Sequence, residues 1–200
     1  MIERIKGILI SPKTEWDKIQ NENATMMDVF LKYVLILAII PAAAIFIGYS
    51  FIGYKVSWGF GVSYTIKGVD VGVRYAIISY ISSVAAFFIS TIVIDALAAP
   101  FKSEKNINKS AQLVGYSFTA SMIAGVLNIL PILGILASIA GIYSLVILYF
   151  GLAKMKKTPD DQVVVYYIIS LLTIVVTYFV ISLILAAILI QTASVSSISF

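Results

Sequence analysis

The 200-residue chain contains no cysteine and no histidine, and only 12% of its residues are charged. The lack of cysteine excludes disulfides, thiolate nucleophiles and cysteine-ligated zinc sites. The lack of histidine excludes a histidine general base and the usual nitrogen ligand of zinc and haem iron. A soluble domain carries about 25% charged residues. The chain is therefore poor both in charge and in the side chains on which much enzyme chemistry depends.

Apolar residues are abundant instead, at 60% of the sequence, and the mean hydropathy is +1.01. About 20 consecutive apolar residues cross a bilayer as a helix. Blocks of that length predict spans over 29–51, 75–99, 111–130, 132–153 and 163–190. Pro131 separates the third and fourth blocks, because proline interrupts the hydrogen-bond ladder of a helix. We expect an all-α integral membrane protein, with a five-helix bundle over 29–190 and a polar C-terminal tail over 191–200.

Residues 1–28 predict a cytoplasmic amphipathic segment. Four apolar residues recur there at helical spacing, namely Ile2, Ile5, Ile8 and Leu9, as is typical of an amphipathic helix. A second turn or two after Pro12 carries Trp16 and Ile19. Two interpretations are open: a helix lying on anionic lipid with Trp16 as its anchor, or a docking surface for a cytoplasmic partner. Thr25 and Asp28 have the spacing of a capping box at the start of the first span.

Lysine and arginine predict the orientation. Five lie in or near the N-terminal segment, three between the second and third spans, and three between the fourth and fifth; the other three lie between the first and second. With the N-terminus in the cytoplasm, eleven of the fourteen positive residues are cytoplasmic. We therefore expect a cytoplasmic N-terminus and an outer C-terminus. The lack of targeting tails favours a prokaryotic inner membrane. Period-two alternation over 55–67, broken at Gly68 and resumed over 69–73, predicts a small outer β-hairpin.

Three polar or helix-breaking residues of the predicted spans are candidates for a function within the membrane. Asp95 is the only acidic residue in these spans, and ionisable residues there are functional candidates by default. We expect an interfacial salt bridge to Lys102 or Lys105, with an ion or proton pathway as the alternative. Pro41 is expected to kink its helix as a packing device, and Asn128 to satisfy backbone groups near a turn.

Three stretches of the chain resemble the Yip family of Ypt/Rab-interacting membrane proteins, and especially its prokaryotic branch. Residues 5–22 read IKGILISPKTEWDKIQNE, like the opening of prokaryotic members. Gly115-Tyr116 is similar to the family's Gly-Tyr signature. Tyr149 and Gly151, followed by Thr158-Pro159, resemble the end of the fourth span and the loop after it. The resemblance implies five spans, a cytoplasmic N-terminus and a role as a membrane adaptor.

The residues and the resemblance together favour a non-enzymatic membrane scaffold or adaptor without cofactor or metal. The expected partners are membrane lipid, a second copy of the chain or another membrane protein, and not nucleic acid. Small-GTPase binding is not expected, because the chain lacks the long N-terminal region of the eukaryotic relatives. The expected docking surface combines Trp16 and Ile19 with Lys156 and Lys157. The alternatives are a small transporter or channel with a polar path near Asp95, and a lipid-handling protein.

Overall fold

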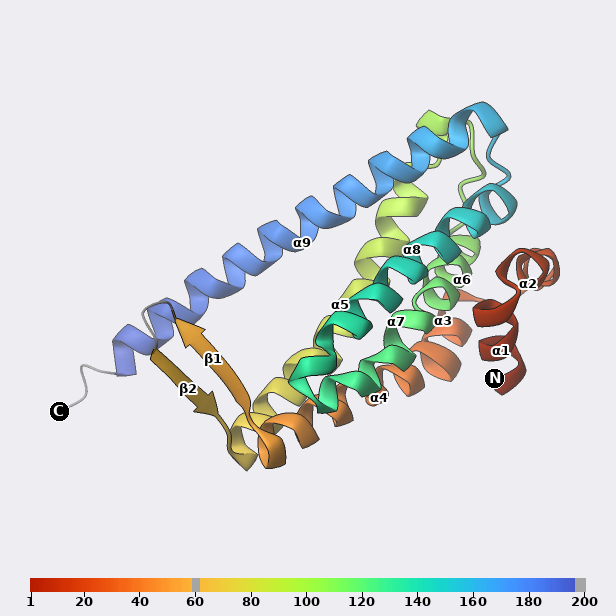
Figure 1. Cartoon of the computed structure of the whole chain (residues 1–200). Coiled ribbons are helices and arrows are strands. Elements are labelled where there is room, and N and C mark those ends of the chain that lie inside the picture. The colour runs from red at the N-terminus through yellow and green to blue at the C-terminus, as the bar shows by residue number, and fades with distance from the viewer. Residues whose placement is uncertain (59–61, 197–200) are drawn as a thin grey trace.

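The structure is a computed structural model that describes residues 1–58 and 62–196 (Figure 1). Within this part of the chain, five helical segments are long and apolar enough to cross a membrane. They are Met26–Ile52, Val69–Ala96, Ile107–Ile129, Pro131–Lys156 and Asp160–Thr177. A two-stranded antiparallel hairpin lies between the first two. The prediction of an all-helical, five-span membrane protein with a small hairpin is confirmed.

Several of these spans consist of more than one helical element. Two short helices precede the bundle, α1 (Ile2–Ile10) and α2 (Pro12–Ile19). The first span contains α3 (Met26–Val29), a π-helical turn, α4 (Leu35–Ile47) and a second π-helical turn. The second span is α5 (Val69–Ala96), and the third contains α6 (Ile107–Ser117), α7 (Thr119–Ala124) and a 3₁₀ turn. The fourth contains α8 (Gly134–Lys156), and the fifth lies in α9 (Asp160–Ser196).

The bundle has two unlike ends (Figure 1). The polar end carries α1, α2, the loop over 97–106 and the turn over 157–159. The hairpin end carries β1 (Tyr54–Trp58), β2 (Val62–Ile66) and the turn around Pro131. The strands pair from Tyr54 opposite Ile66 to Trp58 opposite Val62. Gly53 leaves the first span with a φ of 90°, a conformation that glycine adopts without a steric penalty.

The helix α9 lies apart from most of the bundle over much of its length (Figure 1). It packs against α5 and α8, and its buried side chains recur along one face, at Val163, Tyr166, Ser170 and Ile174. The helix contains the predicted span over 163–190 and continues to Ser196. The predicted polar tail over 191–200 therefore begins inside α9, and its last four residues lie outside the described part of the chain.

The N-terminal helical pair, α1 and α2, packs onto the bundle and contributes to its core. Trp16 and Ile19 are both fully buried, and the indole Nε1 of Trp16 donates a hydrogen bond of 3.1 Å to the carbonyl of Ile147 in α8. The hydroxyl of Tyr143 in α8 donates to the carbonyl of Leu9 at 2.7 Å. The expectation that Trp16 and Ile19 are themselves exposed, as a docking surface or a lipid anchor, is therefore wrong. Their apolar face covers α8 instead.

This packing depends on Gly151 in α8, because glycine has no side chain to stand between the helix backbone and Trp16. A Cβ atom built there lies 2.5 Å from Cε2 of Trp16 and 2.6 Å from Cδ1 of Leu113. Both distances are well below van der Waals contact, and both neighbours are fully buried. Gly151 is thus the point where the indole reaches the backbone of the fourth span.

We predict that Gly151→Ala lowers the thermal stability of the protein in detergent, because the added methyl group displaces Trp16. Overpacking of this kind costs about 1–3 kcal/mol. The measurement is the unfolding temperature, with Gly141→Ala as the matched control. Gly141 lies in the same helix, and a Cβ atom there meets no heavy atom within 4 Å. Equal unfolding temperatures for the two variants would contradict the proposed role of Gly151.

Candidate functional site

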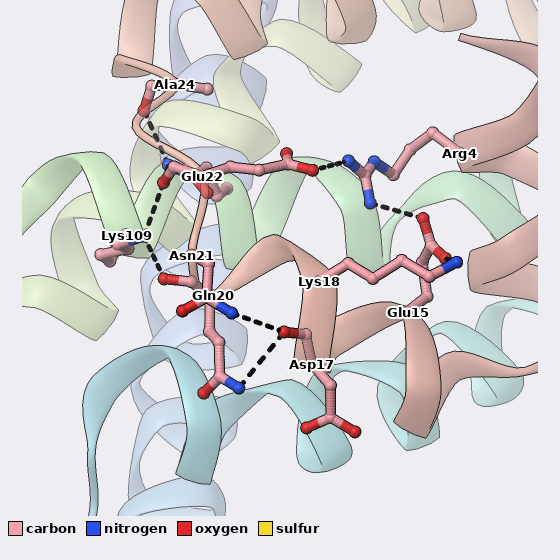
Figure 2. A network of polar contacts seen from close by, with 10 residues as sticks. Arg4, Glu15, Asp17, Lys18, Gln20, Asn21, Glu22, Ala24 and Lys109 are labelled. Carbon is pink, nitrogen blue, oxygen red and sulfur yellow. Dashed lines mark hydrogen bonds and ion pairs between the residues drawn. The ribbon is translucent and has the colours of Figure 1, made fainter.

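The polar end gathers most of the candidate residues. It also holds a network of polar contacts in which Arg4 of α1 pairs with Glu15 and Glu22 (Figure 2). The guanidinium of Arg4 forms an ion pair of 2.5 Å with Glu15 of α2 and a second ion pair with Glu22. It also lies 5.2 Å from the centroid of the Tyr116 ring in α6. Lys18 pairs with the other oxygen of Glu15 at 3.0 Å. Arg4 therefore connects α1 and α2 with the first residues of the loop that leads into the bundle.

Two side chains of α6 hold that loop in place. The ammonium of Lys109 donates to the carbonyls of Gln20 and Glu22, at 2.7 Å each. Gln112 donates through Nε2 to the carbonyl of Ala24 at 2.7 Å. Lys109 and Glu22 are labelled in the same network in Figure 2. The loop between α2 and α3 is thus fixed by side chains that lie more than 80 residues away along the chain.

A buried ion pair, between Lys156 and Asp95, lies at the same end of the bundle. The Lys156 ammonium contacts Oδ1 of Asp95 at 3.0 Å and donates to Oγ of Ser110 at 2.7 Å, and Ser110 donates to the same carboxylate oxygen at 3.0 Å. Lys156 is fully buried and Asp95 is 7% exposed. The three residues join α8, α5 and α6. Removing one partner of a buried pair lowers the free energy of unfolding by much more than an exposed pair contributes to it.

The structure corrects two expectations about these charges. The partner of Asp95 is Lys156 and neither Lys102 nor Lys105, because α8 ends beside the last turn of α5. Lys156 is also unavailable to a docking partner, since its side chain has no exposed surface. The neighbouring Lys157 is 78% exposed and pairs with Glu104 at 2.8 Å.

The pair between Lys157 and Glu104 is sensitive to acid. The hydrogen bond from Lys157 holds the pKa of the Glu104 carboxyl below its usual range. A carboxyl whose pKa is lowered on folding stabilises the folded state above its unfolded pKa, and loses that contribution as the pH falls through the lowered value. This exposed contact therefore contributes at neutral pH and is lost on acidification.

The residues that carry the family resemblance either allow two helices to pack closely or lie in a loop. A Cβ atom at Gly115 would lie 2.5 Å from Cγ1 of Val29 in α3. The Tyr116 ring lies edge-on to Tyr33, with 4.9 Å between the centroids. Gly115 thus allows α6 to approach the start of the first span, and Tyr116 continues that contact.

The remaining motif residues lie around the end of α8. Tyr149 packs edge-on against Tyr167 of α9, with centroids 5.3 Å apart. The hydroxyls of Thr158 and Ser103 are 2.8 Å apart, which connects the turn after α8 to the loop after α5. The carbonyl of Pro159 accepts backbone N–H groups from the first turn of α9.

The two other candidates of the membrane interior lie away from Asp95. Pro41 lies inside α4 and is buried, and a Cβ atom at Gly125 would lie 2.6 Å from its Cβ. The backbone carbonyl of Asn128 accepts a hydrogen bond from the hydroxyl of Tyr54 at the hairpin end. Because Asp95 lies at the opposite end of the bundle, the structure does not bring these three residues into one polar path.

An open pocket of about 710 Å³ lies at the polar end. Its walls come from α1, α2, the first two turns of the first span, and α6, and they include Arg4, Glu15, Lys32 and Tyr116. No local pattern marks Arg4, Glu15 or Lys109 in the sequence, because the contacts of Arg4 with Glu15 and of Lys109 with Gln20 and Glu22 join residues at least 11 positions apart. In residues 1–58 and 62–196, no group of three or more acidic residues is placed to hold a metal ion.

A family model of the Yip1 domain matches residues 6–193. The chain belongs to the Yip1 domain family. Apart from Ile5, all of the motif residues described above lie within the matched range, so the Yip1 domain includes the N-terminal helical pair from residue 6 onward as well as the spans. The resemblance found in the sequence is confirmed.

Two curated relatives of this Yip1 domain protein are both named inner membrane protein YohC, from Escherichia coli strain K12 and from Escherichia coli O6:H1 strain CFT073. Each is 24% identical over 165 residues, which cover 80% of this chain and 83% of the relative. No solved structure matches the chain significantly. The chain is thus an integral membrane protein similar to a bacterial inner membrane protein.

We predict that Lys156→Met destabilises the protein by about 3–5 kcal/mol, because it leaves the Asp95 carboxylate buried without its cation. The double variant with Asp95→Asn should recover most of this loss, since it removes both charges. The measurement is denaturant unfolding in detergent micelles, with Lys157→Met as the control. The exposed Lys157 pair should be worth about 1 kcal/mol or less. Equal losses for Lys156→Met and Lys157→Met would show that the buried pair has no special role.

Proposed function

We propose that this Yip1 domain protein is a non-enzymatic membrane scaffold or adaptor whose partner surface combines α2 with the turn between α8 and α9. One observation carries the proposal: Lys154 of α8 pairs with Asp17 of α2 at 2.5 Å and donates to the Lys13 carbonyl at 3.0 Å. Two segments that are 137 residues apart thereby form one surface. We call it the adaptor surface; its exposed side chains are Lys13, Asp17, Lys157, Asp160 and Asp161.

The character of the adaptor surface suits a reversible protein contact. Its charges are of both signs, and such patterns favour specificity and rapid association. Its underside is rigid, because Trp16 and Ile19 anchor α2 to the bundle. The buried Asp95 is already committed to Lys156 and Ser110, which supports a structural role for this carboxylate over a role in proton or ion transfer. The resemblance to adaptors of the Yip family agrees with this interpretation.

We also propose that the polar end faces the cytoplasm. Eleven of the fourteen lysine and arginine residues lie in segments at this end, and the other three, Lys55, Lys67 and Arg74, lie at the hairpin end. Positive residues near span ends favour the cytoplasmic side.

The absence of cysteine makes this orientation directly testable. We predict that a membrane-impermeant thiol reagent labels Lys67→Cys in intact cells, and labels Lys105→Cys only after the membrane is permeabilised. Both lysines are exposed and lie outside the spans. The unaltered chain serves as the blank. Labelling of Lys105→Cys in intact cells, with Lys67→Cys protected, would reverse the proposed orientation.

The adaptor proposal predicts a partner that depends on the adaptor surface. The tagged protein would be purified from native membranes in mild detergent, and co-purifying proteins would be quantified by mass spectrometry. We expect a stoichiometric partner that is lost, by tenfold or more, from the variant Asp17→Lys/Lys157→Glu. Reversal of two exposed charges weakens a complementary surface strongly.

Lys67→Glu at the hairpin end is the matched control and should retain the partner. Unfolding temperatures close to wild type would show that both variants are folded. Full retention of every stoichiometric partner by the charge-reversed variant would contradict the adaptor surface. If no partner were found and purified protein in proteoliposomes showed an ion flux abolished by Asp95→Asn, the transporter would be favoured instead.

A further inference from the structure

The pocket of about 710 Å³ at the polar end has the size of a small-molecule site, for which 300–1,000 Å³ is typical. We call it the interfacial pocket. The adaptor surface does not include it, because Asp17 and Lys157 are not among its lining residues. Its lining side chains come from α1, α2, the start of the first span and α6. Arg4 connects α1, α2 and α6, and Tyr33 of the first span packs against Tyr116 of α6. It is thus a fixed feature of the fold.

The pocket lies at the level where a membrane begins. Asp28 and Lys32, which line it, belong to the first two turns of the span Met26–Ile52. On the same turns, Met27 is 55% exposed and Leu31 is 51% exposed. Large exposed apolar side chains at the end of a span face the lipid. A lipid headgroup beside this span therefore lies at the depth of the pocket.

The lining carries charged side chains of both signs, three positive and three negative, in addition to the N-terminal residue Met1. The cations are Arg4, Lys18 and Lys32, and the carboxylates are Glu3, Glu15 and Asp28. A ligand with a single negative charge would meet three carboxylates here, and a simple cation would meet three positive groups. A zwitterionic ligand with a phosphate and an ammonium matches both sets.

Some of these charges are available to a ligand at low cost. The side chains of Lys18 and Lys32 are 66% and 77% exposed, and they pair with Glu15 and Asp28. Exposed pairs of this kind are weak, so both ammonium groups can turn to a phosphate. Glu3 is exposed and has no ion pair in the described part of the chain. Its carboxylate can accept hydrogen bonds from an ammonium.

The aromatic residues of the pocket discriminate between two zwitterionic headgroups. A quaternary ammonium, as in choline, is recognised over open aromatic faces. The guanidinium of Arg4 already occupies the Tyr116 ring, and Tyr33 packs against the same ring. The ammonium must then bind through a carboxylate, and only a primary ammonium donates the hydrogen bonds for this.

We propose that the interfacial pocket binds the phosphoethanolamine headgroup of a membrane lipid, with Lys18 and Lys32 contacting the phosphate and Glu3 contacting the ammonium. The acyl chains then run along the exposed apolar side of the first span, next to Met27 and Leu31. The proposal does not depend on the adaptor function, because the two use different residues.

The test is native mass spectrometry of the purified protein titrated with three lipids of the same acyl chains: phosphatidylethanolamine, phosphatidylcholine and phosphatidylglycerol. We expect phosphatidylethanolamine to bind one site at least tenfold more tightly than the other two. Glu3→Gln should abolish its preference over phosphatidylcholine. Lys32→Gln should weaken binding of all three lipids about tenfold, as expected for one charge-assisted hydrogen bond. Lys67→Gln at the hairpin end should change nothing.

Each alternative result would overturn the proposal. Tighter binding of phosphatidylglycerol would identify an anion site, and equal binding of phosphatidylcholine would exclude the contact between Glu3 and the ammonium. A preference that survives both Glu3→Gln and Lys32→Gln would place the lipid elsewhere. Soluble glycerophosphoethanolamine should compete at least tenfold less well than the lipid. If it competes equally, the ligand is a free phosphoethanolamine compound and not a membrane lipid.

Discussion

The contact between Trp16 and the backbone of α8 at Gly151 is the constraint on which the polar end depends. An indole is the largest apolar side chain available, and here it is fully buried with its Nε1–H satisfied by the carbonyl of Ile147. Buried indole groups of this kind dominate the energetics of a contact. With α2 fixed on α8, Asp17 reaches Lys154 and the carboxylate of Glu15 reaches Arg4. The adaptor surface and the interfacial pocket therefore both depend on the packing of α2 against α8.

The ion pairs at the polar end differ in how deeply they are buried, and therefore in how much each contributes to the fold. In the described residues, the pair of Lys156 and Asp95 is the most deeply buried, ahead of the pair of Arg4 and Glu15, and its geometry is completed by Ser110. A buried pair disfavours arrangements of the helices that separate its two charges, because an unpaired buried charge is costly. The pairs of Lys157 and Lys154 are more exposed and can be exchanged for contacts with a partner. Burial thus separates charges that define the fold from charges that remain available for binding.

Hydropathy and periodicity predicted the architecture well, and the contacts at the polar end poorly. Long apolar blocks identify spans because a bilayer demands their length, and the capping box at Thr25 and Asp28 is confirmed because it is a local interaction. The burial of Trp16 was missed because an amphipathic helix has the same pattern whether its apolar face meets lipid or protein. The partner of Asp95 was missed because Lys156 lies 61 residues away. Nothing local to either residue indicates that α8 ends beside α5.

The same ambiguity bears on the two roles proposed for the N-terminal helical pair, toward a protein partner and toward a lipid headgroup. The apolar side chains of α2 pack on α8, and α1 packs against α6 and α7. The exposed face of the pair can therefore carry charges without a cost to this packing. Part of that face adjoins the turn after α8, where Lys154 draws Asp17 toward the bundle. Another part, with Arg4 and Lys18, closes over the start of the first span. A helix merely adsorbed to the membrane would have to bury its apolar side in lipid and would present a surface without fixed geometry. Packing on the bundle instead gives Arg4, Glu15 and Asp17 defined neighbours, and fixed geometry of this kind favours a selective contact.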